Sequence, residues 1–279
     1  MQRHLGLLPL TFLMLLAACE DGMIDYPPGT DAGTPPGTDG STAAATVTLR
    51  TTSAGTHLAD AEGHTLYVFS RDVASTADAS GSSSCAGACA TNWPAFSPAS
   101  FVAGEGVNAA ALGWITRADG TRQATYRGWP LYTFANDDAP GEANGEGNND
   151  VWFVARAPFY SVMVRVGDEA TGRFLVDGGG RTMYLFRNDT QGQGGTAPVS
   201  MCSGMCLNNW PIVPPSDVRL PSTLDAADVT TLTRADGTEQ LVYRGWPLYY
   251  FAMDTAPGDT KGNGVNDVWD LVVPPAAAE

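Results

Sequence analysis

Short runs in which apolar and polar residues alternate recur along this chain and predict strands rather than helices. In residues 64–72, His-Thr-Leu-Tyr-Val-Phe-Ser-Arg-Asp, aromatic and branched side chains alternate with smaller or polar ones, and residues 181–189 repeat the pattern. A period of two with such side chains is typical of a β-strand. Asp119-Gly120 and Asp236-Gly237 stand between further extended segments. Asp-Gly in this setting predicts a β-hairpin.

The whole pattern returns after 117 residues, with no net insertion between the first matched position and the last. The positions that recur at this interval are Tyr67, Cys85, Cys89, Trp93, Tyr126, Tyr132 and Trp152, as Tyr184, Cys202, Cys206, Trp210, Tyr243, Tyr249 and Trp269. A period this long indicates tandem duplication of a complete domain rather than a solenoid repeat.

Helical patterns are almost missing from both copies. Only residues 108–112 and 223–228 are expected to form short turns. The expected fold is therefore all-β, with two tandem homologous small β-domains, sandwich or barrel-like, at residues 47–158 and 159–275.

The first 18 residues have a different character. A short polar, positively charged start is followed by the mostly apolar run 5–16, which is too short for a standard transmembrane helix and predicts a secretory signal peptide. Leu16-Ala17-Ala18 before Cys19 resembles the lipobox of bacterial lipoproteins. That resemblance implies a lipidated Cys19, and the alternative is an ordinary signal peptide that contains a cysteine near its end.

Residues 19–46 combine Pro, Gly, Thr and Asp with almost no large apolar side chain. Such a segment buries too little surface to order itself, so we expect a disordered tether between the lipid and the domains. The localisation predicted from these features is the bacterial cell envelope, lipid-anchored and facing the periplasm or the exterior.

Four cysteines remain after Cys19, as the pairs Cys85/Cys89 and Cys202/Cys206, one in each domain. In an exported protein a local pair predicts a disulfide. A redox-active pair is the alternative. Zinc is disfavoured because each domain offers two sulfurs and no repeated histidine.

Each domain also contains Tyr-x-aromatic-x-x-Asp twice, at residues 67–72, 132–137, 184–189 and 249–254. Together with Cys-x-x-x-Cys and the Trp-Pro that follows it, this motif resembles the bacterial secreted-repeat lipoproteins of unknown function. The resemblance covers residues 47–273 and implies a location and a fold type, but no established activity.

Two interpretations of the motif stay open: the aromatic residues form core and the Asp caps a turn, or both contact a ligand. Tyrosine hydroxyls, if buried, need hydrogen-bond partners that the repeated aspartates can supply. The loop after the second motif concentrates oxygen donors between glycines, which favours calcium. The candidate ligands are Asp137, Asp138, Glu142 and Asp150, and a plain Gly/Asn/Asp surface loop is the alternative.

The longest near-verbatim match between the copies is Tyr-Arg-Gly-Trp-Pro-Leu-Tyr. Exposed, it would form a stacking platform for a sugar ring or another protein, and buried, its tryptophans would fill the core. The candidate ligand surface comprises Tyr126, Arg127, Trp129, Tyr132, Tyr243, Arg244, Trp246 and Tyr249.

The formal charge of −15 makes nucleic acid an unfavourable partner. His57 and His64 have no histidine counterparts in the second copy, and no catalytic motif occurs, so we expect no enzyme and no cofactor other than calcium. The predicted function is an exported, membrane-anchored binding or structural module, with an envelope protein or a glycan as the partner. The alternative is a redox or electron-transfer role of the cysteine pairs and the Tyr/Trp-rich motifs.

Overall fold

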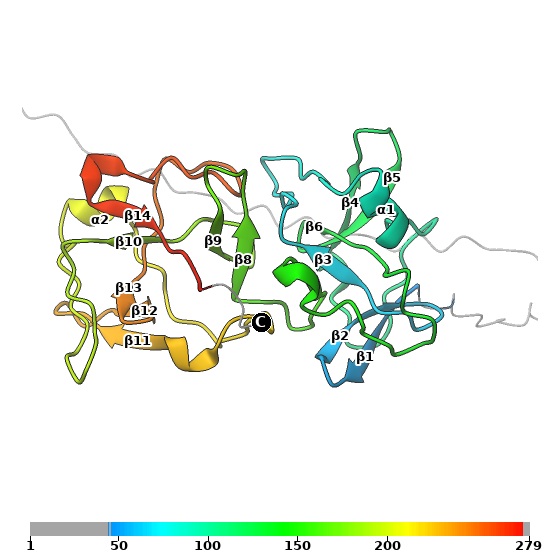
Figure 1. Cartoon of the computed structure of the whole chain (residues 1–279), viewed down its shortest axis with the longest axis horizontal. Coiled ribbons are helices and arrows are strands. Elements are labelled where there is room, and N and C mark those ends of the chain that lie inside the picture. The colour runs from blue at the N-terminus through cyan, green and yellow to red at the C-terminus, as the bar shows by residue number, and fades with distance from the viewer. Residues whose placement is uncertain (1–43, 45, 276–279) are drawn as a thin grey trace, which may run out of the picture. The chain divides into compact units, whose positions relative to one another are not determined.

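The computed structural model describes residue 44 and residues 46–275, and all of them fall within one compact unit. Short strands and long connections make up this unit (Figure 1). The signal peptide, Cys19 and nearly all of the predicted tether lie outside the described residues. Among the helices of the described part, none is long and apolar enough to cross a membrane.

The first domain contains three small antiparallel sheets, which pair β1 with β2, β3 with β7, and β4 with β5 and β6. The β3–β7 sheet pairs the third strand of the domain with its last. The strands are β1 (Val47–Thr52), β2 (Gly55–Asp60), β3 (Tyr67–Phe69), β4 (Leu112–Thr116), β5 (Arg122–Tyr126), β6 (Trp129–Pro130) and β7 (Trp152–Val154).

The second domain repeats this topology, with β8 paired to β9, β10 to β14, and β12 to both β11 and β13. Its strands are β8 (Val162–Val166), β9 (Arg173–Asp177), β10 (Tyr184–Phe186), β11 (Val229–Thr233), β12 (Glu239–Tyr243), β13 (Trp246–Pro247) and β14 (Trp269–Leu271). The all-β fold of tandem small domains is thus confirmed.

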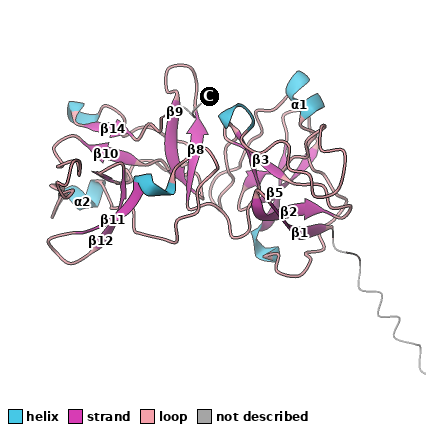
Figure 2. Ribbon diagram, turned by 60° about the horizontal axis from the view of Figure 1, so that its bottom comes forward, coloured by secondary structure: helices cyan, strands magenta, loops and turns pink. Residues whose placement is uncertain are grey.

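Helices are confined to single turns (Figure 2). The α-helices α1 (Ala88–Asn92) and α2 (Cys206–Asn209) each contain the second cysteine of a pair, and sequence patterns did not predict them. Four 3-10 turns cover Ala109–Ala111, Asn148–Asp150, Ala226–Asp228 and Val265–Asp267. The first and third of these confirm the two short turns expected from the sequence.

The predicted Asp-Gly hairpins are confirmed between β4 and β5 and between β11 and β12. Gly120 has φ 81° and Gly237 has φ 82°, a left-handed conformation that glycine adopts without strain. Asp119 Oδ1 accepts the Thr121 N–H at 2.9 Å, which closes the first turn. The aromatic strands β3 and β10 are three residues long, shorter than the alternating runs that predicted them.

The β8–β9 hairpin is buried on both faces because its side chains alternate between two clusters. Val162, Val164 and Leu175 belong to a cluster of the second domain. Met163, Phe174 and Val176 belong to a larger cluster that also contains Tyr126 and Trp129 of the first domain. The two halves therefore share apolar core, and the predicted domain limits of 47–158 and 159–275 stay predictions.

Candidate functional site

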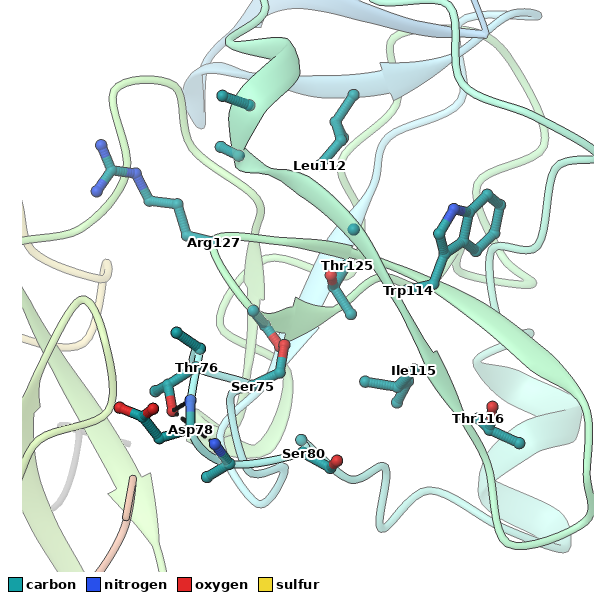
Figure 3. A pocket seen from close by; sticks show the side chains of 17 residues that line it. Ser75, Thr76, Asp78, Ser80, Leu112, Trp114, Ile115, Thr116, Thr125 and Arg127 are labelled. Carbon is teal, nitrogen blue, oxygen red and sulfur yellow. Dashed lines mark hydrogen bonds between the residues drawn. The ribbon is translucent and has the colours of Figure 1, made fainter. Parts of the chain in front are cut away.

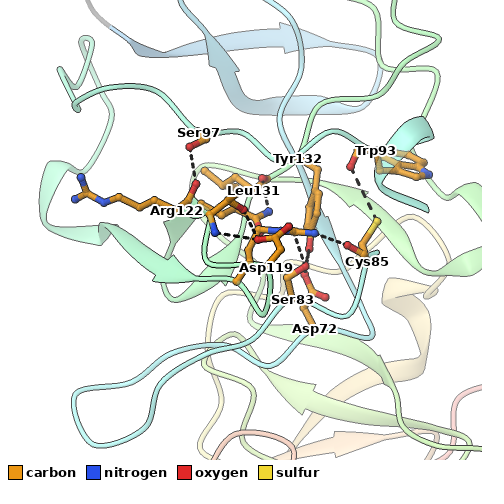
Figure 4. A network of polar contacts seen from close by, with 12 residues as sticks. Asp72, Ser83, Cys85, Trp93, Ser97, Asp119, Arg122, Leu131 and Tyr132 are labelled. Atoms are coloured by element: carbon orange, nitrogen blue, oxygen red, sulfur yellow. Dashed lines mark hydrogen bonds and ion pairs between the residues drawn. The ribbon is translucent and has the colours of Figure 1, made fainter. Parts of the chain in front are cut away.

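The two Tyr-x-aromatic-x-x-Asp motifs of a domain hold each other through reciprocal hydrogen bonds. Tyr67 and Tyr132 exchange both backbone hydrogen bonds, at 2.8 and 3.0 Å. Tyr67 Oη then donates to Asp137 Oδ2 at 2.7 Å, and Tyr132 Oη donates to Asp72 Oδ2 at 2.6 Å. Figure 4 shows the second of these pairs. Each tyrosine is therefore bound to the aspartate of the other motif, an arrangement that we term the clasp.

The second domain contains the same clasp. Tyr184 Oη donates to Asp254 Oδ2 at 2.6 Å, and Tyr249 Oη donates to Asp189 Oδ2 at 2.8 Å. All four tyrosines are completely buried. The prediction that the aspartates satisfy buried tyrosine hydroxyls is confirmed. The aspartate that accepts each hydrogen bond always belongs to the other motif, 60 or 70 residues away in the sequence.

The second oxygen of each clasp aspartate caps a loop, as the core-and-cap interpretation of the motif predicts. Asp72 Oδ1 accepts the Ser84 N–H at 2.7 Å, and Asp137 Oδ1 accepts the Asn144 N–H at 2.9 Å. Burial raises the pKa of Asp72, and likewise that of Asp189, from 3.8 to about 6. A raised pKa means that the folded site disfavours the charged carboxylate.

A continuous stack of four aromatic rings lies beside each clasp. In the first domain the rings follow the order Phe69, Trp152, Trp93 and Phe134, with centroids 4.1, 3.8 and 4.1 Å apart. In the second domain the order is Phe186, Trp269, Trp210 and Phe251, with centroids 4.2, 3.7 and 4.3 Å apart. The clasp tyrosines meet these stacks edge-on.

Both cysteine pairs lie at disulfide distance, with Sγ atoms 2.02 Å apart in Cys85/Cys89 and 1.93 Å apart in Cys202/Cys206. A largely buried arginine connects each pair to the neighbouring sheet. Arg117 donates to the Cys85 carbonyl at 2.5 Å and to Gln123 Oε1 at 2.6 Å, and Arg234 repeats these contacts in the second domain. Sequence reasoning did not single out either arginine.

The four calcium candidates do not converge, and no group of three potential metal-ligating side chains occurs in the described part of the chain. Asp137 is bound in the clasp, and Asp150 pairs with Arg173 at 3.0 Å. Glu142 Oε2 accepts the backbone N–H of Asp138 at 2.7 Å. Calcium binding therefore stays a prediction, and three of its four carboxylates, those of Asp137, Glu142 and Asp150, already bind tyrosine, backbone and arginine donors.

We predict that Glu142→Ala lowers the free energy of unfolding by about 1 kcal/mol, because the loop loses a capping acceptor. Urea denaturation measures the change, with Asp138→Ala as the control, since the side chain of Asp138 is exposed. Calcium or a chelator should leave both proteins unchanged. A calcium-dependent gain in the wild type alone would support the calcium hypothesis.

The first copy of the candidate ligand surface is sealed by the second domain. Trp129 is 0% exposed, and its Nε1 donates to the Gly178 carbonyl, just after β9, at 2.9 Å. Tyr126 packs edge-on against Phe159 with ring centroids 5.8 Å apart. Of the four candidate residues here, Tyr132 is in the clasp and only Arg127 is exposed. An open stacking platform at this copy is therefore wrong.

The second copy opens onto a cavity of about 670 Å³, which Tyr243, Arg244 and Trp246 help to line. Trp246 is partly exposed, Arg244 is exposed, and the Nε of Arg244 lies 3.5 Å from Asp228 Oδ2. Tyr243 is only 2% exposed, and its hydroxyl has no hydrogen-bond partner among the described residues. Burial raises its pKa to about 12. Tyr249, the fourth candidate, is held in the clasp.

A larger hollow of about 740 Å³ lies between the 75–81 loop and β4 (Figure 3). Asp78 and Arg127 are its only charged lining side chains, and both are exposed. The cavity at Trp246 contains a buried hydroxyl that has no hydrogen-bond partner, and none of the residues that line this hollow has such a group. The hollow is therefore a weaker candidate for a binding site.

This chain belongs to a family of secreted repeats whose function is unknown. The family model matches residues 48–97, 113–156, 166–214 and 230–273, which together make up more than half of the chain. No curated protein and no solved structure matches the chain. Each domain therefore consists of two family repeats, and the clasp is the contact between them. Membership of a secreted family fits an extracellular or envelope location.

Proposed function

We propose that this protein is an exported lipoprotein that binds another macromolecule through the open face of its second domain. We define the open face as the cavity lined by Tyr243, Arg244 and Trp246 together with its rim, Gln193 and Val273. The signal-like run ending at Cys19 and the family of secreted repeats support export. Lipid on Cys19 would fix the tethered domains at a membrane surface.

One observation carries the binding role: the tryptophans of the two copies of one segment have different surroundings. In the first domain Trp129 of Tyr-Arg-Gly-Trp-Pro-Leu-Tyr is closed over by protein, although Arg127 is exposed, whereas in the second domain the partly exposed Trp246 lines a cavity. A Trp, an Arg and a buried hydroxyl without a partner converge there, the kind of mixed apolar and polar lining that binding sites use. The need to fill a small core explains Trp129, but it does not explain a partly exposed Trp246.

Lipid anchoring is tested by labelling producing cells with a radioactive fatty acid. The wild-type chain should carry label and sediment with membranes, whereas Cys19→Ala should lose the label and become soluble or remain uncleaved. A matched Cys85→Ala/Cys89→Ala variant should keep the label. An unlabelled wild-type chain would contradict the anchor.

Binding is tested by placing a photo-crosslinking amino acid at Gln193 or Val273, on the rim of the open face. Illumination of cells of the native host should give adducts of defined mass, which Trp246→Ala abolishes. The same amino acid at Ala118 or Ala235, in exposed hairpin turns that do not line the cavity, is the matched control. If neither rim position gives an adduct above that control, the binding role fails.

The second candidate function is electron transfer, which the continuous ring stacks and the adjacent cysteine pairs favour. Each of Cys85 and Cys202 is only 1% exposed, so a structural disulfide should resist mild reductant. We predict that thiol titration of the native full chain in mild reductant finds no free thiol. Reversible reduction at a moderate potential would instead make the redox role the better explanation.

A further inference from the structure

We propose that the open face receives a β-hairpin from another protein, with apolar side chains on one face and two arginines. This inference rests on the proposed function and specifies its partner. The cavity together with the buried, unpartnered Tyr243 hydroxyl marks the site. The chain itself contains an example of such a ligand.

That example is the β8–β9 hairpin, which closes the matching face of the first domain. Its residues Met163, Phe174 and Val176 share a buried cluster with Trp129. The backbone after β9 accepts the Trp129 indole N–H through Gly178, and the Val166 N–H donates to the Ser70 carbonyl at 3.0 Å. The repeated face is therefore shaped to bind a hairpin.

The cavity of the second domain corresponds to the face of the first domain that β8–β9 covers, but no hairpin of the described residues fills it. Three of its lining residues, Gln191, Tyr243 and Trp246, stand 117 positions after Ala74, Tyr126 and Trp129. Their counterparts in the first domain are all buried, whereas Gln191 and Trp246 are partly exposed. No described residue accepts a hydrogen bond from the Trp246 indole, so an incoming backbone carbonyl can accept it as Gly178 does for Trp129.

Charge specifies the arginines of the partner. In the first domain, Arg173 of the docked hairpin pairs with Asp150 at 3.0 Å, and Arg165 donates to the Asp72 carbonyl. Asp267 is the counterpart of Asp150 and has the same left-handed backbone, with φ of 58° against 59°. Asp267 is exposed, and its carboxylate forms no ion pair among the described residues. An arginine from a partner would complete that pair.

A second copy of this chain is a poor occupant. Its β8–β9 hairpin is already engaged, and the equivalent β1–β2 hairpin has different side chains. Where β8–β9 has Met163, Arg165 and Phe174, the corresponding residues are Thr46, Thr48 and His57. His57 is also fully buried, with its ring bonded to Gly55 and Thr65. The partner is thus a different protein.

The test uses the hairpin that the chain already contains. A cyclised peptide of residues 159–180 is titrated into the full mature chain in detergent and followed by calorimetry. We expect saturable binding of one peptide per chain. Trp246→Ala should weaken it by about tenfold or more, as loss of a central aromatic contact does. Gln193→Trp, which adds bulk at the cavity mouth without removing a core contact, should do the same.

Two matched controls establish the mode of binding. A cyclised peptide of residues 42–63, the equivalent hairpin of the first domain, should bind at least about tenfold more weakly. A 159–180 peptide with Arg173→Glu should also bind about tenfold more weakly, and Asp267→Arg in the chain should restore its affinity. Failure of this rescue, or equal binding of the two hairpins, would overturn the inference.

The experiments can reject the hairpin partner and the binding function independently of each other. Rim adducts from Gln193 or Val273 without any binding of the 159–180 peptide leave the function standing and reject a hairpin partner. Adducts destroyed by periodate but not by protease indicate a glycan and likewise reject it. If no rim adducts form, the function itself is rejected.

Discussion

Trp152→Ala should lower the free energy of unfolding by about 3–5 kcal/mol, the range for deleting a buried aromatic side chain. Trp152 is 3% exposed and stands inside the ring stack, with Phe69 at 4.1 Å on one side and Trp93 at 3.8 Å on the other. The clasp tyrosine Tyr132 also contacts it edge-on at 5.0 Å. Truncation therefore removes two stacking contacts and leaves a cavity beside the clasp.

Urea denaturation followed by tryptophan fluorescence measures this loss. Trp114→Ala is the matched control, because Trp114 stacks on Phe101 but is partly exposed, and it should cost about 1 kcal/mol. Trp269→Ala should match Trp152→Ala, since the second stack repeats the first. Equal costs for Trp152 and Trp114 would show that the stack contributes little beyond ordinary packing.

The second large effect is a dependence of stability on pH between about 4 and 6. Because burial raises the folded-state pKa of Asp72 and Asp189 to about 6, the folded state binds their protons more tightly than the unfolded state does. Stability from these groups is therefore fully present below about pH 4 and is lost as the pH rises through about 6. Each group contributes at most about 3 kcal/mol to this change.

Denaturation curves from pH 4 to 7 test this dependence. The free energy of unfolding of the wild type should fall across the window, whereas Asp72→Asn/Asp189→Asn should show a flatter profile. Asp168→Asn is the control, because its hydrogen bonds from Thr171 lower the pKa of Asp168, so its contribution is lost only as the pH falls below about 4. A wild-type profile as flat as that of the double variant would mean that the clasp carboxylates titrate normally.

The clasp explains why the family motif has its spacing. Tyr and the aromatic residue two positions later enter the core together, and Asp lies beyond the end of the strand, where it reaches the other motif. Its glycine neighbours matter as well: Gly145 and Gly262 donate their N–H to the clasp tyrosines, and a Cβ at either would lie within 3.0 Å of an aromatic ring. One clasp therefore orders both the stack and the loop over it.

Sequence reasoning succeeded where the signal was local. Alternation identified strands, and Asp119-Gly120 predicted its hairpin because turn chemistry acts over a few residues. For the acidic loop, oxygen-rich composition suggested calcium, but it gave no sign that Asp150 pairs with Arg173 of the next domain. Sequence reasoning also missed Arg117, although Arg117 and Gln123 recur at the 117-residue interval as Arg234 and Gln240, a signal that could have identified this contact.

The sequence by itself determined the duplication, the all-β class and the need of the buried tyrosines for acceptors, because these follow from period, turn residues and chemistry within short stretches. Only the tertiary structure decided which aspartate each tyrosine binds, how the four rings stack, and that the Trp246 copy stays open while the Trp129 copy is sealed. These are contacts between residues dozens of positions apart. They depend on how strands and domains pack against one another. Two segments with nearly the same sequence cannot show that their surroundings differ.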